Sequence, residues 1–309
     1  MKELKCYSCS SPNIKLIGDI APNNTFAGQV LEQLIDGGGL YKCNGCNMFF
    51  RHPQLNEKEL NKLYRLGNLK NWSSNASHRR DWYLIRNWLV LQEGIERILD
   101  IGCFDGRFLE YLGKDYCWLG IEIHNEAASS AESKGVELVG RNFENMPVLS
   151  PLADLVVAVD VLEHSSDPKS FLKAAASCVR PGGYIVISTG NTDALSWRLM
   201  GSKYWYCHIP EHFSFINPTW ARYVAPKLDL QIEEFKVFSH SEGKVDFKRK
   251  LFETIGNLLL LICPKMFAMI RKFGFGGINY RLYPELALAP PCWVTSMDHM
   301  IIVFQRRTN

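Results

Sequence analysis

Four cysteines within the first 46 residues have the spacing of metal ligands. Cys6 and Cys9 form one CxxC pair, and Cys43 and Cys46 form a second. Each CxxC turn directs two sulfurs toward one centre, so two turns supply the four thiolates of a closed tetrahedral zinc site. Because protein ligands would fill all four positions, we expect a structural zinc ion rather than a catalytic one. Four unrelated buried cysteines are the alternative.

The two pairs are separated by 33 residues, more than the ~15–20 usual between such pairs. We therefore expect the insert to be a loop or an extra hairpin, with Asp36–Gly39 as its turn. The N-terminus has no apolar secretory segment, so all ten cysteines should be reduced thiols.

A second candidate site is a strand-to-helix turn at Leu99–Phe108, which reads LDIGCFDGRF. It places two glycines, Gly102 and Gly106, where a chain must bend closely around a ligand. Twenty residues after Gly102, Glu122 ends the next apolar run. A carboxylate at that point can accept hydrogen bonds from ribose hydroxyls.

The glycine pattern separates two nucleoside cofactors. A nicotinamide-binding turn has the pattern GxGxxG, whose glycines let the backbone approach a pyrophosphate. Here Phe104 and Arg107 stand at the second and third glycine positions, and Asp100 and Asp105 add negative charge. Negative charge repels a pyrophosphate but tolerates a cationic adenosyl group. The turn therefore favours S-adenosylmethionine over NAD.

The elements that position this turn alternate between strands and helices. Apolar runs predict strands at Arg97–Ile101, Cys117–Ile123, Val136–Val139, Asp154–Val159 and Tyr184–Ser188. Helices are predicted at Ser77–Leu91, Gly106–Leu112, Asn125–Lys134 and Asp167–Val179. This alternation indicates an α/β fold, a doubly wound and mostly parallel sheet that binds ligands at the carboxyl ends of its strands. A last strand at Asp298–Phe304 is expected to pair antiparallel at the sheet edge.

Length and composition agree with a folded protein of two parts. The chain has 309 residues, of which 47% are hydrophobic and 22% are charged, enough for a sizeable core. The net charge of +3 argues against a polyanionic partner such as bulk nucleic acid. No run of 18 uncharged apolar residues occurs, so we expect a cytoplasmic protein without a membrane-spanning helix.

The motifs together resemble class I S-adenosylmethionine-dependent methyltransferases. The resemblance rests on DIGCFDG at 100–106, GIE at 120–122, NFENMP at 142–147, DVLEH at 160–164 and RPGG at 180–183. The resemblance implies that the doubly wound sheet is seven-stranded. In that family the glycine turn carries the methionine portion, Glu122 would bind the ribose, Asn142 the adenine amine, and the Phe143 backbone the ring. The cofactor-binding residues implied by the resemblance are Asp100, Gly102, Cys103, Gly106, Glu122, Ile123, Asn142, Phe143 and Asp160. Glu163 and His164 would either contact the cofactor or serve packing and capping.

The cysteine head joined to this core further resembles bacterial methyltransferases that act on sugars and polysaccharide precursors. Those enzymes carry a His-Glu-His-like element after the fifth strand, which here contains His208, Glu211 and His212. Methyl transfer to a hydroxyl needs a base near neutral pKa, and we assign that role to His212, with Glu211 orienting or charge-stabilising its imidazole. Trp205, Tyr206, Phe213 and Phe215 would form an apolar wall. A packed histidine cluster is the alternative.

Residues 244–272 are basic and strongly apolar, with seven Lys or Arg residues against two acidic ones. Such a segment can lie in an anionic membrane interface, or it can form a helical lid over the core or a dimer partner. We expect a zinc module with a connecting helix at 1–66 and a methyltransferase domain at 67–309. An insertion at about 241–297 would precede the last strand.

The expected function is methyl transfer from S-adenosylmethionine to a small molecule, a nucleotide-linked sugar or surface-glycan precursor, with zinc as a structural metal. The alternatives are an RNA methyltransferase with a zinc module, a natural-product or lipid-precursor methyltransferase, and a non-catalytic zinc-ribbon protein. No specific nucleic acid is expected as a partner. We expect a cytoplasmic location, with peripheral contact at the inner face of the membrane through 244–272.

Overall fold

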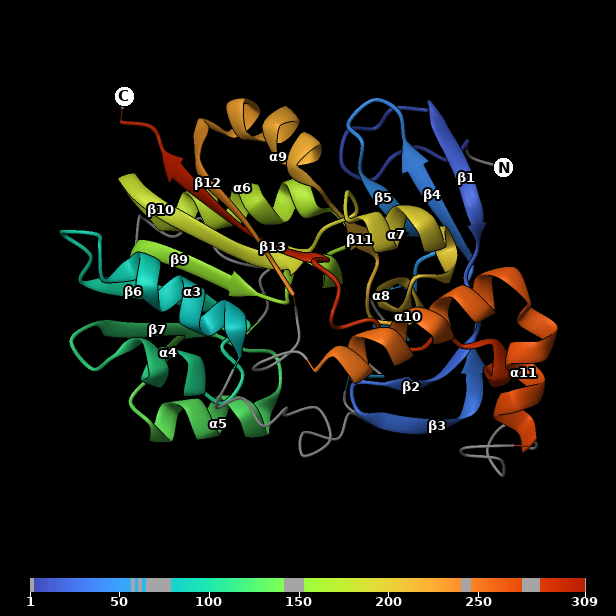
Figure 1. The fold of residues 1–309 in the computed structure, drawn as a ribbon. Helices are drawn as coiled ribbons and strands as arrows, with labels where there is room; N and C mark the ends of the chain where they lie inside the picture. Colours follow the sequence, from blue (N-terminus) through green and yellow to red (C-terminus); the bar gives the residue numbers. More distant parts are fainter. Residues whose placement is uncertain are drawn as a thin grey trace.

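A computed structural model describes residues 3–56, 59–60, 63–64, 79–141, 153–239, 246–273 and 284–308. Its largest element is a seven-stranded sheet in the order β12-β13-β10-β9-β6-β7-β8 (Figure 1). Strands β6 to β10 run parallel to one another, and β13 lies antiparallel between β10 and β12. The strands are β6 (Arg97–Ile101), β7 (Cys117–Ile121), β8 (Glu137–Gly140), β9 (Ala153–Val159), β10 (Val179–Gly190), β12 (Leu230–Phe238) and β13 (His299–Arg306). The expected doubly wound sheet is confirmed.

The expected position of the last strand is wrong in one respect. β13 does pair antiparallel with β10, but it does not form the sheet edge. The edge strand is β12, which pairs with the other side of β13 and which the sequence analysis did not predict. Its LQIEEFKVF sequence carries four charged or amide side chains in nine residues, because an edge strand exposes part of its surface to water.

Alternate residues of each strand enter two separate cores, as expected for a sheet covered on both faces. Leu155, Val157 and Val186 face the helices α3 (Arg80–Leu89), α4 (Arg107–Leu112) and α5 (Asn125–Ser133). Val156 and Ile187 face α6 (Pro168–Cys178) and α9 (Pro218–Val224). The core on the α6 side also takes in three of the N-terminal cysteines, so the cysteine segment extends one face of the main sheet.

The N-terminal segment forms a small sheet in the order β1-β4-β5-β11. Its strands are β1 (Ile14–Asp19), β4 (Gly39–Cys43), β5 (Phe49–His52) and β11 (Ser214–Phe215). The expected extra hairpin exists, as β2 (Asn23–Phe26) and β3 (Gln29–Ile35). It turns at Ala27–Gly28, where both residues have positive φ, whereas Asp36–Gly39 leads into β4, so the expected turn is misplaced. The proposed domain boundary at residue 66 lies outside the described residues.

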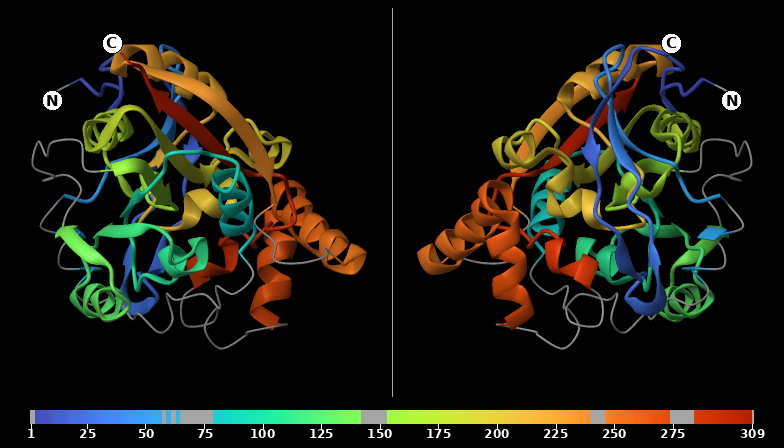
Figure 2. Two further views of the ribbon diagram at one scale, coloured as in Figure 1. Left: turned by 90° about the vertical axis from the view of Figure 1, so that its left-hand side faces the viewer. Right: turned by 90° about the vertical axis from the view of Figure 1, so that its right-hand side faces the viewer.

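A third core joins this N-terminal sheet to the helices that follow β10 and β12. It gathers side chains from α7 (Leu195–Met200), α8 (Trp205–His208), α10 (Phe247–Ile262) and α11 (Pro264–Phe273). Short 3₁₀ turns complete the described chain at Leu162–His164, Gly201–Lys203, Ala225–Leu228 and Pro284–Leu288. α10 and α11 stand between β12 and β13 in the sequence, and Figure 2 shows them projecting from the body of the molecule. None of the helices in the described ranges is long and apolar enough to cross a membrane.

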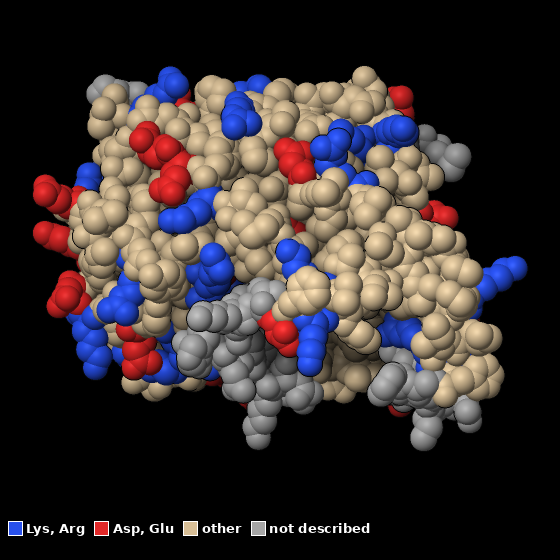
Figure 3. Space-filling model, viewed as in Figure 1, with Lys and Arg blue, Asp and Glu red and all other residues tan. Residues whose placement is uncertain are grey.

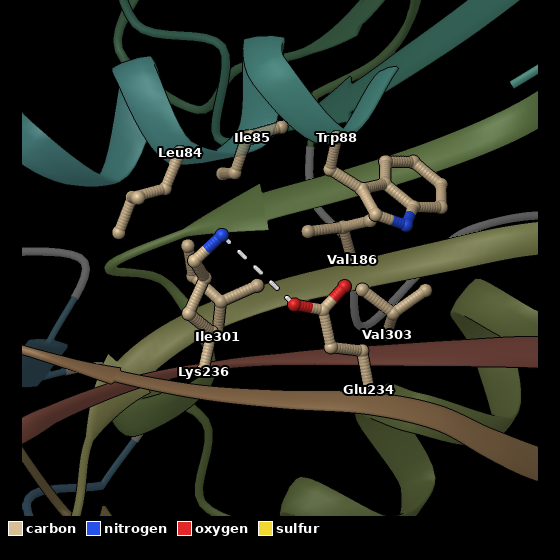
Figure 4. A pocket seen from close by; sticks show the side chains of 8 residues that line it. All are labelled: Leu84, Ile85, Trp88, Val186, Glu234, Lys236, Ile301 and Val303. Carbon is tan, nitrogen blue, oxygen red and sulfur yellow. Dashed lines mark ion pairs between the residues drawn. The ribbon is translucent and has the colours of Figure 1, made fainter. Parts of the chain in front are cut away.

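A narrow cleft lies between α3 and the strands β10, β13 and β12 at one edge of the sheet (Figure 4). At its mouth, Lys236 and Glu234 of the edge strand lie 4.0 Å apart. The cleft is lined by Leu84, Ile85, Trp88, Val186, Glu234, Lys236, Ile301 and Val303. It opens on the sheet face rather than at the carboxyl ends of the parallel strands, where ligands of this fold class bind.

One buried hydrogen bond connects α9 to the cysteine segment. The Trp220 indole Nε1–H donates to Ser8 Oγ at 2.9 Å, and both residues are buried. We predict that Ser8→Ala and Trp220→Phe each lower the free energy of unfolding. In a double-mutant cycle their coupling should be about 0.5–1.5 kcal/mol, the usual net value of such a bond. Urea unfolding of the four proteins measures it.

The matched control cycle pairs Ser8→Ala with Trp88→Phe, a tryptophan that packs on Tyr184. Its coupling energy should be near zero. Equal coupling in both cycles would contradict the assignment of the interaction to the Trp220 bond.

Candidate functional site

The four N-terminal cysteines converge as their spacing predicts. The Sγ atoms of Cys6, Cys9, Cys43 and Cys46 all lie within 4.8 Å of one another. The Cys6–Cys46 and Cys9–Cys43 Sγ pairs are 3.6 and 3.5 Å apart. Four thiolates at the usual Zn–S distance of about 2.3 Å would have sulfurs about 3.8 Å apart. The cluster therefore fits a tetrahedral metal ion.

Two backbone N–H groups would stabilise a negative charge on the sulfur of Cys43. The N–H groups of Gly45 and Cys46 point at Cys43 Sγ, at 3.3 and 3.5 Å. A hydrogen bond from Cys46 lowers the pKa of the Cys6 thiol to about 5. The same hydrogen bond and burial raise the pKa of Cys46, and burial raises that of Cys9 to about 11, so the cluster favours a thiolate at some of its sulfurs and not at all four.

The glycine turn lies at the carboxyl end of β6, as expected. Gly102 and Gly106 have φ of +77° and +78°, the left-handed region that favours glycine. A Cβ on Gly102 would lie 2.6 Å from Val161 Cγ2, so a side chain there would also collide with the end of the neighbouring strand. The N–H groups of Gly102 and Cys103 both donate to the Ile121 carbonyl, at 2.8 and 3.1 Å. These bonds fix the turn against the end of β7.

Glu122 lies directly behind this turn. Its two carboxylate oxygens accept hydrogen bonds from the backbone N–H groups of Phe104 and His124, at 2.9 and 2.7 Å. Burial raises the pKa of Glu122, and these two bonds partly oppose that effect. Each oxygen retains a second lone pair for a further donor. The next residue, Ile123, is exposed and presents an apolar surface.

The charge around the turn is smaller than the sequence suggests. Asp105 forms an ion pair with Arg107 at 2.6 Å, so its charge is locally balanced. Asp100 is buried, and burial together with the charge of Glu122 raises its pKa well above the usual range. The negative charge that the two aspartates add near the turn is therefore reduced, because one is paired and the other is desolvated.

Asp160 follows β9 at the same edge of the sheet. It has a φ of +53°, and its N–H donates to the Ser188 carbonyl at 3.0 Å. Its carboxylate accepts a hydrogen bond from Arg79 Nη2 at 2.5 Å, and Arg79 also pairs with Asp81 at the start of α3. Burial opposes the charge of Arg79, but the two carboxylates outweigh it and raise the pKa of the guanidinium.

A buried polar network adjoins Asp160. The Glu163 carboxylate accepts hydrogen bonds from the Tyr206 hydroxyl and from Thr189 Oγ1, the latter at 2.8 Å. Both carboxylate oxygens of Glu163 thus have partners within the protein, as its packing alternative expects. Ligand atoms of Glu163, His164 and His212 lie within 4.8 Å of one another, and the two imidazoles meet edge to face at 4.9 Å.

His212 lies in this network. Its Nδ1 is 3.1 Å from the Tyr206 carbonyl, which can only accept, so Nδ1 carries the proton and Nε2 the lone pair. Burial and the neighbouring His164 lower the pKa of His212 well below its ordinary value, so the imidazole is neutral. Tyr206, Phe213 and Phe215 of the expected apolar wall are buried here, and Trp205 is half-buried.

His208 and Glu211 are engaged elsewhere. His208 Nε2 is 3.0 Å from the Pro22 carbonyl, and Asn23 donates to both the ring and the carbonyl of His208. The Glu211 carboxylate accepts a hydrogen bond from the Ala27 backbone N–H. Both side chains thus hold the β2–β3 hairpin, and the Tyr206 carbonyl rather than Glu211 orients the His212 imidazole. The orienting role expected for Glu211 therefore differs from its observed contact with the hairpin backbone.

Some residues of the site were not predicted from the sequence, and two predicted residues lie outside the described ranges. Arg79 was not proposed as a site residue, although the RRD sequence at 79–81 is a signal of charge at a helix start. Tyr206 was expected only in the apolar wall, and its hydrogen bond to Glu163 was missed. Buried Arg51 was also missed. Its guanidinium donates to the carbonyls of Cys207 and Ile209. Asn142 and Phe143 lie outside the described residues.

The sequence of this chain is similar to that of known methyltransferases. Residues 56–232 match the family described as methyltransferase domain. The ubiquinone biosynthesis O-methyltransferase of Aeromonas salmonicida is 34% identical over 137 residues, which cover 40% of this chain and 58% of that enzyme. The enzyme of the same name from Cupriavidus pinatubonensis is 26% identical over 208 residues, covering 61% of this chain and 83% of the enzyme. The chain thus spans little more than half of the first relative.

Solved structures agree on the fold. One chain of the complex between the Haloferax volcanii Trm112 methyltransferase activator and a methyltransferase superposes with a TM-score of 0.50. The match covers 74% of this chain and 91% of that chain, at 14% identity. It supports the Rossmann-like methyltransferase architecture described above.

The Glu163 network has a testable pH dependence. Burial and the charge of Asp160 raise the pKa of Glu163 from 4.5 to about 7. The stability that this group contributes is therefore complete below about pH 4.5 and is lost as the pH rises through 7. We predict that Glu163→Gln, which cannot titrate, gains on the order of 2–3 kcal/mol relative to wild type between pH 4.5 and 8.

Urea unfolding of both proteins across this pH range measures the difference. Glu110→Gln, on the exposed side of α4, is the control and should follow the wild type. Parallel pH curves for wild type and Glu163→Gln would contradict the raised pKa.

Proposed function

We propose that the acceptor of this methyltransferase is a hydroxyl group of a small molecule. The chain belongs to the methyltransferase domain family and is an S-adenosylmethionine-dependent methyltransferase. The observation that carries the proposal is a convergence at one edge of the sheet. The glycine turn, the Asp160–Arg79 pair and the neutral His212 all lie beyond the carboxyl ends of parallel strands.

The residues behind the turn fit the adenosyl half of the cofactor. We propose that Glu122 binds the ribose hydroxyls through its second lone pairs, and that Ile123 packs against the adenine. A Cβ on Gly102 would meet Val161 and one on Gly106 would meet Val136 and Ala131, so the two glycines let the turn pack closely against the protein. We propose that the backbone of Gly102 and Cys103 in this turn lines the methionine portion. Asn142 and Phe143 remain proposed adenine contacts from the sequence resemblance.

S-adenosylmethionine supplies an electrophilic methyl group when bound, and the protein must then align the acceptor and exclude water. A hydroxyl acceptor also has to lose a proton. His212 is suited to accept it because Nδ1 is fixed on the Tyr206 carbonyl and Nε2 keeps its lone pair. The lowered pKa keeps the imidazole unprotonated at neutral pH, and it also makes His212 a weaker base than the near-neutral group expected from the sequence. We propose His212 as the general base, with Glu211 and His208 holding the hairpin beside it.

The names of the two relatives support one feature of the acceptor, the atom that is methylated. They are named for O-methylation in ubiquinone biosynthesis, which supports oxygen as the methylated atom and a ring hydroxyl as the first candidate. The aromatic surroundings of His212, with Tyr206 at 4.2 Å between ring centroids, also suit an aromatic acceptor. The sugar or glycan precursor expected from the sequence is the second candidate, supported by the resemblance of the cysteine head but not by these relatives.

We predict that the purified protein methylates a polyprenylated catechol faster than any nucleotide-linked sugar. His212→Ala should lower kcat by about 10²–10⁴-fold and leave the affinity for S-adenosylmethionine nearly unchanged, because a general base acts on the acceptor. Transfer of label from the cofactor to a panel of both acceptor classes measures activity, and calorimetry measures cofactor binding.

His52→Ala is the histidine control, since this side chain contacts Tyr7 in the N-terminal sheet, and its activity should match the wild type. Full activity in a folded His212→Ala protein would remove this residue from the reaction. Transfer only to nucleotide sugars would establish the second acceptor candidate, and no transfer to either class would reject the proposal.

The convergence of the four cysteine sulfurs supports a structural zinc ion. We propose that residues 1–66 form the zinc module, joined to a methyltransferase domain at 67–309 with its insertion at about 241–297. Cys43 and Cys46 lie in the same core as α6 and α9. Metal binding should therefore stabilise the main sheet as well as the module.

We predict about one zinc ion per chain, and a lower metal content and folding yield for Cys43→Ser, because thiolate coordination contributes directly to folding. Metal analysis of protein purified without chelators measures it. Cys117→Ser is the control, since Cys117 is exposed and distant in sequence from the cluster. Zinc-free wild-type protein would show that the cluster is not a zinc site.

A further inference from the structure

Helix α10 buries polar side chains and exposes large apolar ones. Among its residues, Glu253 and Asn257 are buried together with Leu260. The Glu253 carboxylate accepts hydrogen bonds from the backbone N–H and the hydroxyl of Thr295, at 3.0 and 2.7 Å. Two of the three buried residues of this helix are therefore polar, whereas a surface helix usually buries an apolar stripe.

The apolar side of α10 faces outward. Phe247 and Phe252 are each 75% exposed and Ile262 is 78% exposed. The same surface continues along α11, where only Phe267 is buried. The exposed apolar residues of the two helices are Phe247, Leu251, Phe252, Ile255, Ile262, Met266, Met269, Ile270 and Phe273. An exposed patch of this extent marks a binding surface.

The surface formed by α10 and α11 carries a net positive charge. Residues 246–273 contain six Lys or Arg residues and two acidic ones, a net charge of +4. Glu253, which is buried against Thr295, pairs with Arg249 at 3.0 Å, and Asp246 caps the start of α10, so the excess positive charge comes from the lysines and Arg271. The basic residues are Lys248, Arg249, Lys250, Lys265, Arg271 and Lys272. Figure 3 shows uncharged surface over these helices with Lys and Arg among it.

We propose that the outer face of α10 and α11 docks on an anionic lipid surface. Large apolar side chains beside lysine and arginine enter the headgroup region, while the cations attract anionic lipid. A second copy of this chain is a poorer occupant, because two faces of net charge +4 would repel one another. Charge complementarity thus selects the membrane.

The inner side of the same helices reaches the candidate site. Leu260 and Phe267 pack in one core with Trp197, Tyr206 and Phe215, and Tyr206 holds both Glu163 and His212. Docking would therefore bring the acceptor side of the protein close to the lipid surface. An acceptor with an isoprenoid or acyl tail could then be taken from the membrane.

The experiment is co-sedimentation of the full chain with vesicles, either pure phosphatidylcholine or an equal mixture with phosphatidylglycerol. We expect at least about tenfold stronger partitioning onto the anionic vesicles, weakened by salt. Phe247→Ser/Phe252→Ser and Lys248→Glu/Lys250→Glu should each reduce binding on the order of tenfold or more.

Matched controls carry the same chemical changes away from this face. Val90→Ser/Leu91→Ser replaces exposed apolar residues after α3, and Lys114→Glu/Lys173→Glu reverses two exposed charges. Both should bind like wild type. Equal binding of wild type to the two kinds of vesicle, or equal losses in test and control variants, would overturn the proposal. So would a dimer in sedimentation equilibrium that Phe247→Ser/Phe252→Ser dissociates, since a second copy would then occupy the face.

Discussion

The buried carboxylate of Glu163 is the interaction on which the rest of the site depends. Thr189 of β10 and Tyr206 of α8 donate to its two oxygens, so one side chain ties the end of the sheet to the segment after it. The backbone repeats the link, since the Phe213 N–H donates to the Glu163 carbonyl at 2.8 Å. A carboxylate without water is costly unless its lone pairs are filled. This requirement fixes Tyr206, and through it His212.

The site residues of the main sheet could be predicted because few residue types meet their constraints. At Gly102 a positive φ coincides with a clash at Val161, so glycine is required. The two CxxC pairs identify a four-sulfur cluster even across 33 residues, since each pair fixes its own geometry. The same local rules predicted five parallel strands to within a few residues, apart from the longer β10. Edge strand β12 was missed because its polar face weakens the apolar pattern.

The roles of His208 and Glu211 could not be predicted, because spacing does not reveal which atoms a side chain meets. Both follow β10 and lie near His212 in sequence, as a catalytic element would. In the structure they bind the carbonyl of Pro22 and the N–H of Ala27, partners about 185 residues earlier in the chain. The backbone N–H and carbonyl groups of a hairpin require hydrogen-bond partners, as the polar groups of a substrate do. Local sequence cannot tell these two demands apart.

These long-range contacts make the cysteine module part of the site. Cys43 ends β4, which pairs with β5, and Arg51 of β5 is buried with its guanidinium on the carbonyls of Cys207 and Ile209. Burial lowers the pKa of this arginine to about 10, so it stays charged at neutral pH and its donors must remain bound. The segment between those carbonyls and His212 therefore has its position set by β5. A metal ion bound by the four cysteines would hold β4 in place. It would act on the His212 imidazole only through the backbone and the Arg51 guanidinium, because it has no open coordination position.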